Sequence, residues 1–324
     1  MKTKRLLPLA LLIFILAAQD ACQDSRSLPA DEIALGKQLF FDPILSSTRQ
    51  ISCSSCHRPE NAFADTTAVS LGVFKRKGKR NTPSVMNLGD AAFLFWDGRV
   101  ETMQQQALIP IANRDEMALP VDSAVGRLRA NAFYQSAFVR IYKQQPSSLL
   151  LARALAAFEL SLETGDTPFD DWKTNDDSSA VSESVKRGFS LFNGKANCVR
   201  CHFGRDFANT EFRNIGLFNG KNLSDSGRAA ITRRSADLGK FKIGPLRNVA
   251  LTAPYMHNGM FKTLREVIDY YDNPDKFIPD AINRDTLLAR PIGLTNQDKQ
   301  DLENFLRSLT SQRLALGGSQ SNQK

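Results

Sequence analysis

The chain has 324 residues, with 42 Lys and Arg against 34 Asp and Glu, and a formal charge of +8. About 300 residues remain once the N-terminal segment described below is set aside, which is more than one typical domain and excludes a single small domain. No repeated motif of basic and aromatic residues accompanies the excess of basic residues, so nucleic acid is not indicated as a partner.

Residues 1–21 have the features of an export signal peptide. A basic stretch at 2–5 precedes an apolar run at 6–18, which is too short to span a bilayer. We therefore expect a periplasmic or otherwise exported protein, whose charge falls to about +6 because the signal carries three basic residues and one acidic residue. Cys22 follows at the position where a lipoprotein signal would be cut, but residues 19–20 depart from that pattern. A lipid anchor at Cys22 and ordinary cleavage both stay open.

Helical periodicity dominates the rest of the chain. Apolar residues recur at helical spacing in five segments, which are 31–41, 147–161, 184–192, 263–271 and 295–309. The last opens with an N-cap pattern, Thr295 to Asp298. Residues 166–184 contain few apolar side chains and are predicted to be a linker. No alternating strand pattern of useful length occurs, so the predicted fold is mostly α.

A five-residue pattern occurs twice, and each copy follows one of these helices. Cys53-Ser54-Ser55-Cys56-His57 and Cys198-Val199-Arg200-Cys201-His202 are both C-x-x-C-H, the attachment signature of a c-type haem. Two thiols form thioethers with the haem vinyl groups, and the adjacent imidazole (His57 or His202) becomes an axial iron ligand. The sequence therefore predicts two covalently bound haems.

Other uses of these cysteines fit the spacing poorly. A four-cysteine zinc site usually keeps its two C-x-x-C pairs roughly 12 to 20 residues apart and needs no His after each pair. Disulfides would leave both histidines unexplained and would join cysteines only two residues apart in the pattern.

The two predicted helices that precede the motifs share the pattern Gly-x-x-Leu-Phe, at 36–40 and 188–192. This internal repeat indicates two copies of one small haem domain. We predict two c-type cytochrome-like helical domains with long loops, covering 30–175 and 180–315, in which the porphyrin supplies much of the core. The basic run 75–80 could steer an acidic redox partner, or it could be an ordinary solvated surface.

Five further segments occur in an order that resembles a known family. They are Arg80-Asn81-Thr82-Pro83-Ser84-Val85-Met86-Asn87, Phe95-Trp96-Asp97-Gly98-Arg99, Gln106-Ala107-Leu108-Ile109-Pro110, Asn113-Arg114-Asp115-Glu116-Met117, and the stretch 245–259 from Pro-Leu-Arg-Asn to Tyr-Met-His-Asn-Gly. Together they resemble the bacterial di-haem cytochrome c peroxidases and their relative MauG. The resemblance covers essentially the mature chain.

The resemblance implies a role for each half. The N-terminal haem would meet peroxide, the C-terminal haem would receive electrons, and Trp96 would lie between them as an electron relay. Glu116 would be the acid-base that moves the peroxide proton, and Gln106 would hold peroxide or water by hydrogen bonding. On their residue types alone, Trp96 would be a buried core residue and Glu116 a solvated one.

The chain departs from the family's standard peroxidases at the first haem. Those enzymes carry a distal His after the first motif, which blocks the iron until the other haem is reduced, whereas residues 58–80 contain no His here. We therefore expect a first haem that is ready for peroxide when fully oxidised.

Two further sites come only from the resemblance. The family offset places Tyr271 as the sixth ligand of the second haem iron, with Met256 or Met260 as the alternative. Asn81, Thr252 and Pro254 match the family's calcium site between the domains, where oxygen ligands suit Ca²⁺.

Three functions remain open from the sequence. The first is reduction of hydrogen peroxide to water with electrons from a small cytochrome c or cupredoxin. The second is a MauG-like oxidase that acts on a protein or organic substrate through a high-valent di-haem state. The third is a non-catalytic di-haem electron carrier, against which Glu116, Gln106 and the missing distal His argue. A homodimer is also left open.

Overall fold

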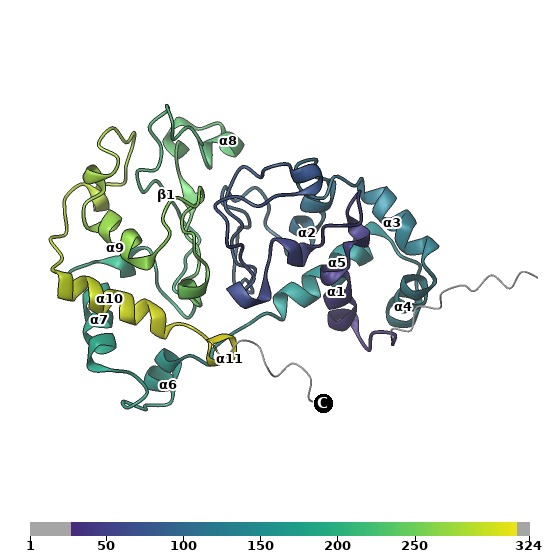
Figure 1. Ribbon diagram of the computed structural model, residues 1–324, viewed down its shortest axis with the longest axis horizontal. Coiled ribbons are helices and arrows are strands. Elements are labelled where there is room, and N and C mark those ends of the chain that lie inside the picture. Colours follow the sequence, from purple (N-terminus) through teal and green to yellow (C-terminus); the bar gives the residue numbers. More distant parts are fainter. Residues whose placement is uncertain (1–26, 316–324) are drawn as a thin grey trace, which may run out of the picture.

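The computed structural model describes residues 27–315, and its helices form two lobes that lie side by side (Figure 1). The first lobe contains α1 (Glu32–Phe41), α2 (Met103–Ala112), α3 (Val121–Ala130), α4 (Ala132–Tyr142) and α5 (Ser148–Leu160). The second contains α6 (Pro168–Thr174), α7 (Glu183–Asn193), α8 (Ala229–Thr232), α9 (Leu264–Asp272) and α10 (Asn296–Ser308), and α11 (Gln312–Ala315) follows it. β1 (Phe212–Arg213) and β2 (Phe241–Lys242) form one short antiparallel pair. The mostly helical prediction is confirmed.

All five predicted helices are present, as α1, α5, α7, α9 and α10. Their ends follow from local chemistry. The Asp31 side chain accepts a hydrogen bond from the Ala34 amide and begins α1, which ends at Asp42 before a proline. The predicted cap of α10 is a complete capping box, in which Thr295 and Asp298 each accept from the other's backbone amide.

The predicted linker 166–184 is wrong in part, because residues 168–174 form α6. Thr167 and Asp170 make a capping box, and Pro168 occupies the first helical turn, where its missing N–H is not needed. Phe169 is buried among the aromatic side chains of the second lobe. The polar residues that indicated a linker are therefore helix-capping residues. Helices α2, α3 and α4 were also not predicted.

Two matching helix pairs form the centre of the lobes, α1 with α5 and α7 with α10. A Cβ on Gly36 would collide with the Ala154 carbonyl, and a Cβ on Gly188 would collide with the Asp301 carbonyl. The glycines of the repeated Gly-x-x-Leu-Phe pattern therefore let each helix pair pack backbone against backbone. The repeat seen in the sequence is thus a repeat of packing geometry.

The repeat continues beyond the helix pairs. The bridge Leu94↔Val100 precedes the N-cap Thr102 of α2, and the bridge Tyr255↔Phe261 precedes the N-cap Thr263 of α9 at the same spacing. Each bridge encloses a glycine with positive φ, Gly98 or Gly259. Trp96 and His257 occupy equivalent positions within these two turns.

Each lobe has its own hydrophobic cluster. The cluster of the first lobe runs from Leu35 to Phe158 along the chain, and the larger cluster of the second runs from Phe169 to Leu309. These clusters agree with a division near residue 165, whereas the bounds 30–175 and 180–315 stay a prediction. Leu314, at the end of the described chain, packs against the first cluster.

A buried polar network joins the lobes. The Arg247 guanidinium is 6 % exposed and donates to both carboxylate oxygens of Asp170, at 2.8 Å each, and to Asp206 at 3.0 Å. Asn87 from the first lobe donates to Asp206 at 3.2 Å. Such fully paired buried charges are costly to separate, so this network fixes the relative placement of the two lobes.

Among residues 27–315 no helix is long and apolar enough to cross a membrane. The predicted signal peptide 1–21 and Cys22 lie outside the described residues.

Candidate functional site

The first C-x-x-C-H motif is a tight turn. Residues Cys53–Ser55 form a single 3-10 turn, and the amides of Cys56 and His57 donate to the Cys53 carbonyl at 3.2 and 2.9 Å. The His57 Nδ1 lies 3.0 Å from the Phe63 carbonyl, which accepts its proton. This hydrogen bond fixes the ring's orientation, and the Pro83 backbone is a second hydrogen-bond partner of the ring.

The second motif has the same geometry. The amides of Cys201 and His202 donate to the Cys198 carbonyl at 3.0 and 2.9 Å, and the His202 Nδ1 donates to the Phe207 carbonyl at 2.9 Å. Burial lowers the pKa of both motif histidines, which keeps the imidazoles neutral, as metal ligation requires.

The thiols and imidazoles of both motifs fit a c-type haem. The thiols of Cys53, Cys56, Cys198 and Cys201 are all free, so the disulfide alternative is contradicted for these cysteines. Each turn also offers one neutral imidazole, the kind of side chain that ligates haem iron. When bound there, a haem would supply an iron centre that can exchange electrons.

The structure brings Glu116 to the first motif. Burial is the main cause that raises the pKa of the Cys53 and Cys56 thiols, and the Glu116 carboxylate adds a smaller charge repulsion to both, which requires proximity. The Asn113 side chain donates to Glu116 Oε1 at 2.7 Å, and burial raises the pKa of Glu116. Gln106 lies on α2, and its Oε1 is buried without a hydrogen-bond partner among the described residues. An unpaired buried oxygen of this kind suits a missing donor such as peroxide or water.

The loop between Leu71 and Lys77 packs on the Glu116 segment. The Val73 amide donates to the Glu116 carbonyl at 2.8 Å, and Arg76 donates to the Arg114 carbonyl at 2.8 Å. A Cβ on Gly72 would collide with the carbonyls of Asp115 and Glu116, so only glycine permits this approach. In the standard peroxidases the blocking His follows the first motif, and here this stretch instead supports the backbone of the candidate acid-base.

Tyr271 faces the second motif. Burial raises the pKa of its phenol, and the thiols of Cys198 and Cys201 add to that shift, so the phenol lies near both. Met260 is 38 % exposed, and its sulfur lies 3.6 Å from the Asn258 amide nitrogen. Met256 packs in the neighbouring cluster that contains Tyr271. The charge coupling therefore places Tyr271 near both motif cysteines, and its role as an iron ligand stays a prediction.

Trp96 lies where the lobes meet. Its indole Nε1 donates to the Asn81 carbonyl at 2.8 Å, the Asn81 amide donates to the His257 carbonyl at 2.7 Å, and the Lys242 amide donates to the Trp96 carbonyl at 2.8 Å. The Trp96 and His257 rings are 6.4 Å apart, and His257 stacks on Phe241 at 3.7 Å. Trp96 is therefore held by its indole to the first half and by its backbone carbonyl to the second.

The residues predicted to bind calcium lie close to this interface, but their contacts do not show whether they bind an ion. The Asn81 amide nitrogen donates to the Thr67 carbonyl at 3.2 Å, and the Thr252 hydroxyl donates to the Val249 carbonyl at 3.2 Å. Within residues 27–315 no group of three or more His, Cys, Asp or Glu side chains is placed to hold a metal ion. A calcium site at Asn81, Thr252 and Pro254 would instead use an amide oxygen and backbone carbonyls, and it stays a prediction.

The sequence analysis did not single out Glu159 or Lys242, two ionisable residues whose pKa values are shifted. Glu159 is 5 % exposed near the end of α5, and burial raises its pKa to about 8. Burial lowers the pKa of Lys242, beside Trp96, to about 8. For Glu159 a signal was present, because it is an acid within the apolar helix 147–161.

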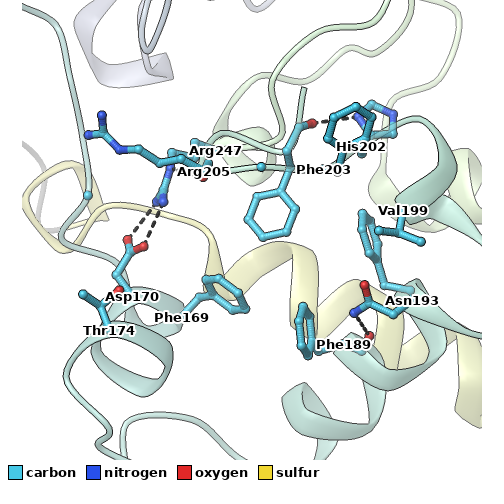
Figure 2. A pocket seen from close by; sticks show the side chains of 14 residues that line it. Phe169, Asp170, Thr174, Phe189, Asn193, Val199, His202, Phe203, Arg205 and Arg247 are labelled. Carbon is cyan, nitrogen blue, oxygen red and sulfur yellow. Dashed lines mark hydrogen bonds and ion pairs between the residues drawn. The ribbon is translucent and has the colours of Figure 1, made fainter. Parts of the chain in front are cut away.

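A cavity of about 610 Å³ opens beside the second motif (Figure 2). Phe169 and Phe189 line it, the Asp170 and Arg247 ion pair forms one side, and His202 lies at another. Its lining includes neither the motif cysteines nor Tyr271. We therefore treat it as a hollow next to the His202 ring, separate from the place where Tyr271 and the cysteines converge.

Comparison with known proteins agrees with this arrangement. The family model for di-haem cytochrome c peroxidase matches residues 30–178. Methylamine utilization protein MauG of Methylorubrum extorquens is 35% identical over 296 residues, covering 90% of this chain and 82% of the relative. Cytochrome-c peroxidase IdrP1 of Pseudomonas sp. strain SCT is 35% identical over 314 residues, with coverages of 87% and 81%. The crystal structure of a MauG-like protein associated with microbial copper homeostasis matches with a TM-score of 0.80 and 32% identity, covering 89% of this chain and 91% of that one.

Proposed function

This chain belongs to the di-haem cytochrome c peroxidase and MauG family, and from that premise we propose that it reduces hydrogen peroxide to water. The electrons would come one at a time from a small c-type cytochrome or a cupredoxin. They would enter at the haem of Cys198, Cys201 and His202 and leave at the haem of Cys53, Cys56 and His57. The named relatives divide between MauG and cytochrome c peroxidases, so the reaction itself is our proposal.

The observation that carries the proposal is the partly buried Glu116 near the first motif. Cleavage of an O–O bond needs a group that takes the proton from the inner peroxide oxygen and gives it to the outer one. Asn113 holds Glu116 Oε1, so Oε2 is the oxygen available to accept and return that proton. The Val73 amide fixes the backbone at the same residue. The unpaired Oε1 of Gln106 would hold the peroxide or a water.

Trp96 is proposed as the relay between the haems, because an indole can be oxidised transiently by one electron. Its indole bond to the Asn81 carbonyl and the bond from the Lys242 amide to its own carbonyl would hold it in one orientation. A calcium ion at Asn81, Thr252 and Pro254 would bind beside the same contacts. Export belongs to the same proposal, with a lipid anchor at Cys22 and ordinary cleavage as the two alternatives.

A MauG-like oxidase is the second candidate, and Tyr271 favours it. A phenolate ligand stabilises ferric and more oxidised iron, whereas a thioether stabilises ferrous iron and raises the potential. A second haem with Tyr271 as ligand would be a poor store of electrons and a better partner for sharing an oxidation. A protein or organic substrate would then replace the small cytochrome or cupredoxin as the source of electrons, and peroxide would remain the oxidant.

Steady-state peroxide turnover with reduced cytochrome c tests the proposal, using enzyme that has not been reduced beforehand. We expect turnover without a lag, because residues 58–80 provide no blocking His. Absence of turnover with cytochromes and cupredoxins, combined with oxidation of an added organic donor, would favour the second candidate.

Glu116→Gln should slow the reaction with peroxide by roughly 10² to 10⁴, the range for a lost acid-base group. The wild-type rate should fall as the pH drops through the raised pKa of Glu116, because only the carboxylate accepts the proton. Glu60→Gln removes an exposed acid of the same lobe and is the control. Wild-type kinetics in Glu116→Gln would assign Glu116 a structural role.

A further inference from the structure

Glu159 is a buried acid that the proposed reaction does not use. Its side chain is 5 % exposed, and its Oε2 is buried without a hydrogen-bond partner among the described residues. Buried carboxyl groups are normally paired with a cation or with hydrogen-bond donors, since leaving one unpaired costs free energy. An unpaired acid in the core therefore requires an explanation.

The position of Glu159 relates it to the first haem site. Of the charges that act on the Cys53 thiol, the carboxylate of Glu159 has the largest effect, ahead of Cys56 and Glu116. The preceding residue, Phe158, packs edge-on against Phe63, whose carbonyl holds His57. Glu159 therefore borders the pocket where Cys53 would be joined to the haem.

The internal repeat supplies a matched comparison. Gly36 packs against Phe158 in the first lobe as Gly188 packs against Phe305 in the second. The next residue along each helix is Glu159 in α5 and Leu306 in α10, which is 9 % exposed. The same place in the fold therefore holds an acid beside the first motif and an apolar side chain beside the second.

No nearby charge accounts for Glu159. Burial is the sole cause of its raised pKa of about 8. Helices α1, α2 and α3 pack against α5. None of the charged residues on these helices contributes to the pKa shift of Glu159. They are Glu32 and Lys37 on α1 and Asp122, Arg127 and Arg129 on α3, and α2 carries no charged residue. Cys53, Cys56 and Glu116 are the titratable groups on the motif side, and the two thiols would be thioethers once haem is attached.

We propose that Glu159 is a proton-holding residue of the first haem pocket, which binds a proton when the haem is reduced and releases it when the haem is oxidised. On oxidation one electron passes to the second haem or an external acceptor, and the O–H bond of Glu159 breaks and its proton passes to solvent water. Reduction reverses both transfers. The net charge of a poorly solvated pocket then stays constant, which removes the cost of a buried uncompensated charge.

This inference rests on the proposed function only in requiring a haem at Cys53, Cys56 and His57, and it is tested without peroxide. The midpoint potential of each haem is measured by spectroelectrochemistry on the holoprotein between about pH 6 and 9, a window set around the group's shifted pKa. In the wild type the first haem's potential should fall as the pH rises, because proton loss disfavours the reduced state. The limiting slope is a tenfold change in the equilibrium constant per pH unit, equivalent to 59 mV.

Two variants remove the acid, and one variant is the control. The variants are Glu159→Gln and Glu159→Leu, the second of which has the residue found in the second lobe. In both, the midpoint potential of the first haem should vary less with pH over this window, while the potential of the second haem should keep its wild-type pH dependence. Glu101→Gln removes an exposed acid of the same lobe and should behave as wild type. A wild-type slope in Glu159→Gln overturns the inference.

If neither variant folds with haem, infrared difference spectra of the wild type decide the question. A protonated carboxyl band must appear on reduction of the first haem, and its absence overturns the inference. A denatured mass with no haem on the Cys53 to Cys56 segment overturns the proposed function instead.

Discussion

The two lobes share one scaffold and differ in the ionisable groups placed on it. Each lobe packs a helix pair through one glycine, forms the same C-x-x-C-H turn, and holds the His Nδ1 with a carbonyl. The first lobe places Glu116 and Glu159 near its motif, whereas the second places Tyr271 near its motif and has Leu306 at the position of Glu159. The fold therefore supplies two equivalent C-x-x-C-H turns, and under the proposed function the residues around them would give the two haems different chemistry.

Removing one haem at a time should have the largest effect, because it leaves only one of the two lobes with its haem. Cys53→Ala with Cys56→Ala should lose the first haem and all reaction with peroxide. Cys198→Ala with Cys201→Ala should lose the second haem and steady-state turnover, while one equivalent of peroxide still reacts. Denatured mass and stopped-flow absorbance measure both results, and Cys22→Ala should keep both haems. Full steady-state turnover in the Cys198 and Cys201 variant would contradict the assigned roles.

Replacing Tyr271 tests whether its phenol is the ligand that distinguishes the second haem from the first. Tyr271→Met should change only the spectrum of the second haem and raise its potential by on the order of 100 mV, a small part of the roughly 0.8 V range that axial ligands set. Tyr270→Phe is the matched control, because Tyr270 is buried next to it but donates to the Ile215 carbonyl at 2.6 Å. A near-infrared sulfur-to-iron band in the oxidised wild type would exclude Tyr271 and favour Met256 or Met260.

The smallest expected effect tests the equivalence of the two scaffolds. Gly36→Ala and Gly188→Ala should each destabilise the protein by about 1 to 3 kcal/mol, because each Cβ would overlap a helix carbonyl. Gly126→Ala in α3 meets nothing within 4 Å and should be neutral or stabilising by about 0.5 to 1 kcal/mol. Denaturant unfolding of the holoprotein measures all three. A neutral Gly188→Ala would mean that the second helix pair tolerates separation.

Much of the fold could be predicted, because the decisive signals are local. The C-x-x-C-H spacing and the caps at Asp31 and Thr295 depend on residues within one turn of each other. Helix α6 was missed because a capping box such as Thr167 with Asp170 has the composition of a loop until its hydrogen bonds are seen. Helix α2 was missed because it contains Pro110, which normally ends a helix.

The candidate site was less predictable, since it depends on contacts between distant segments. Glu116 and Tyr271 were identified by resemblance, and their coupling to the motif cysteines could only come from the structure. Glu159 is unremarkable in composition, and its importance lies in an unpaired oxygen and in the comparison with Leu306. Sequence spacing does not report whether a buried carboxylate has a partner.

The loop 71–77 has a consequence for how the protein would serve a cell. Its backbone contact with Glu116 and its closely packed Gly72 hold the candidate acid-base in a loop that contains no His. Under the proposed function, such an enzyme would react with the first peroxide that it meets without being reduced beforehand. Continued removal of peroxide would still need electrons from its carrier, so the carrier and not an activation step would set the response to a sudden oxidant burst.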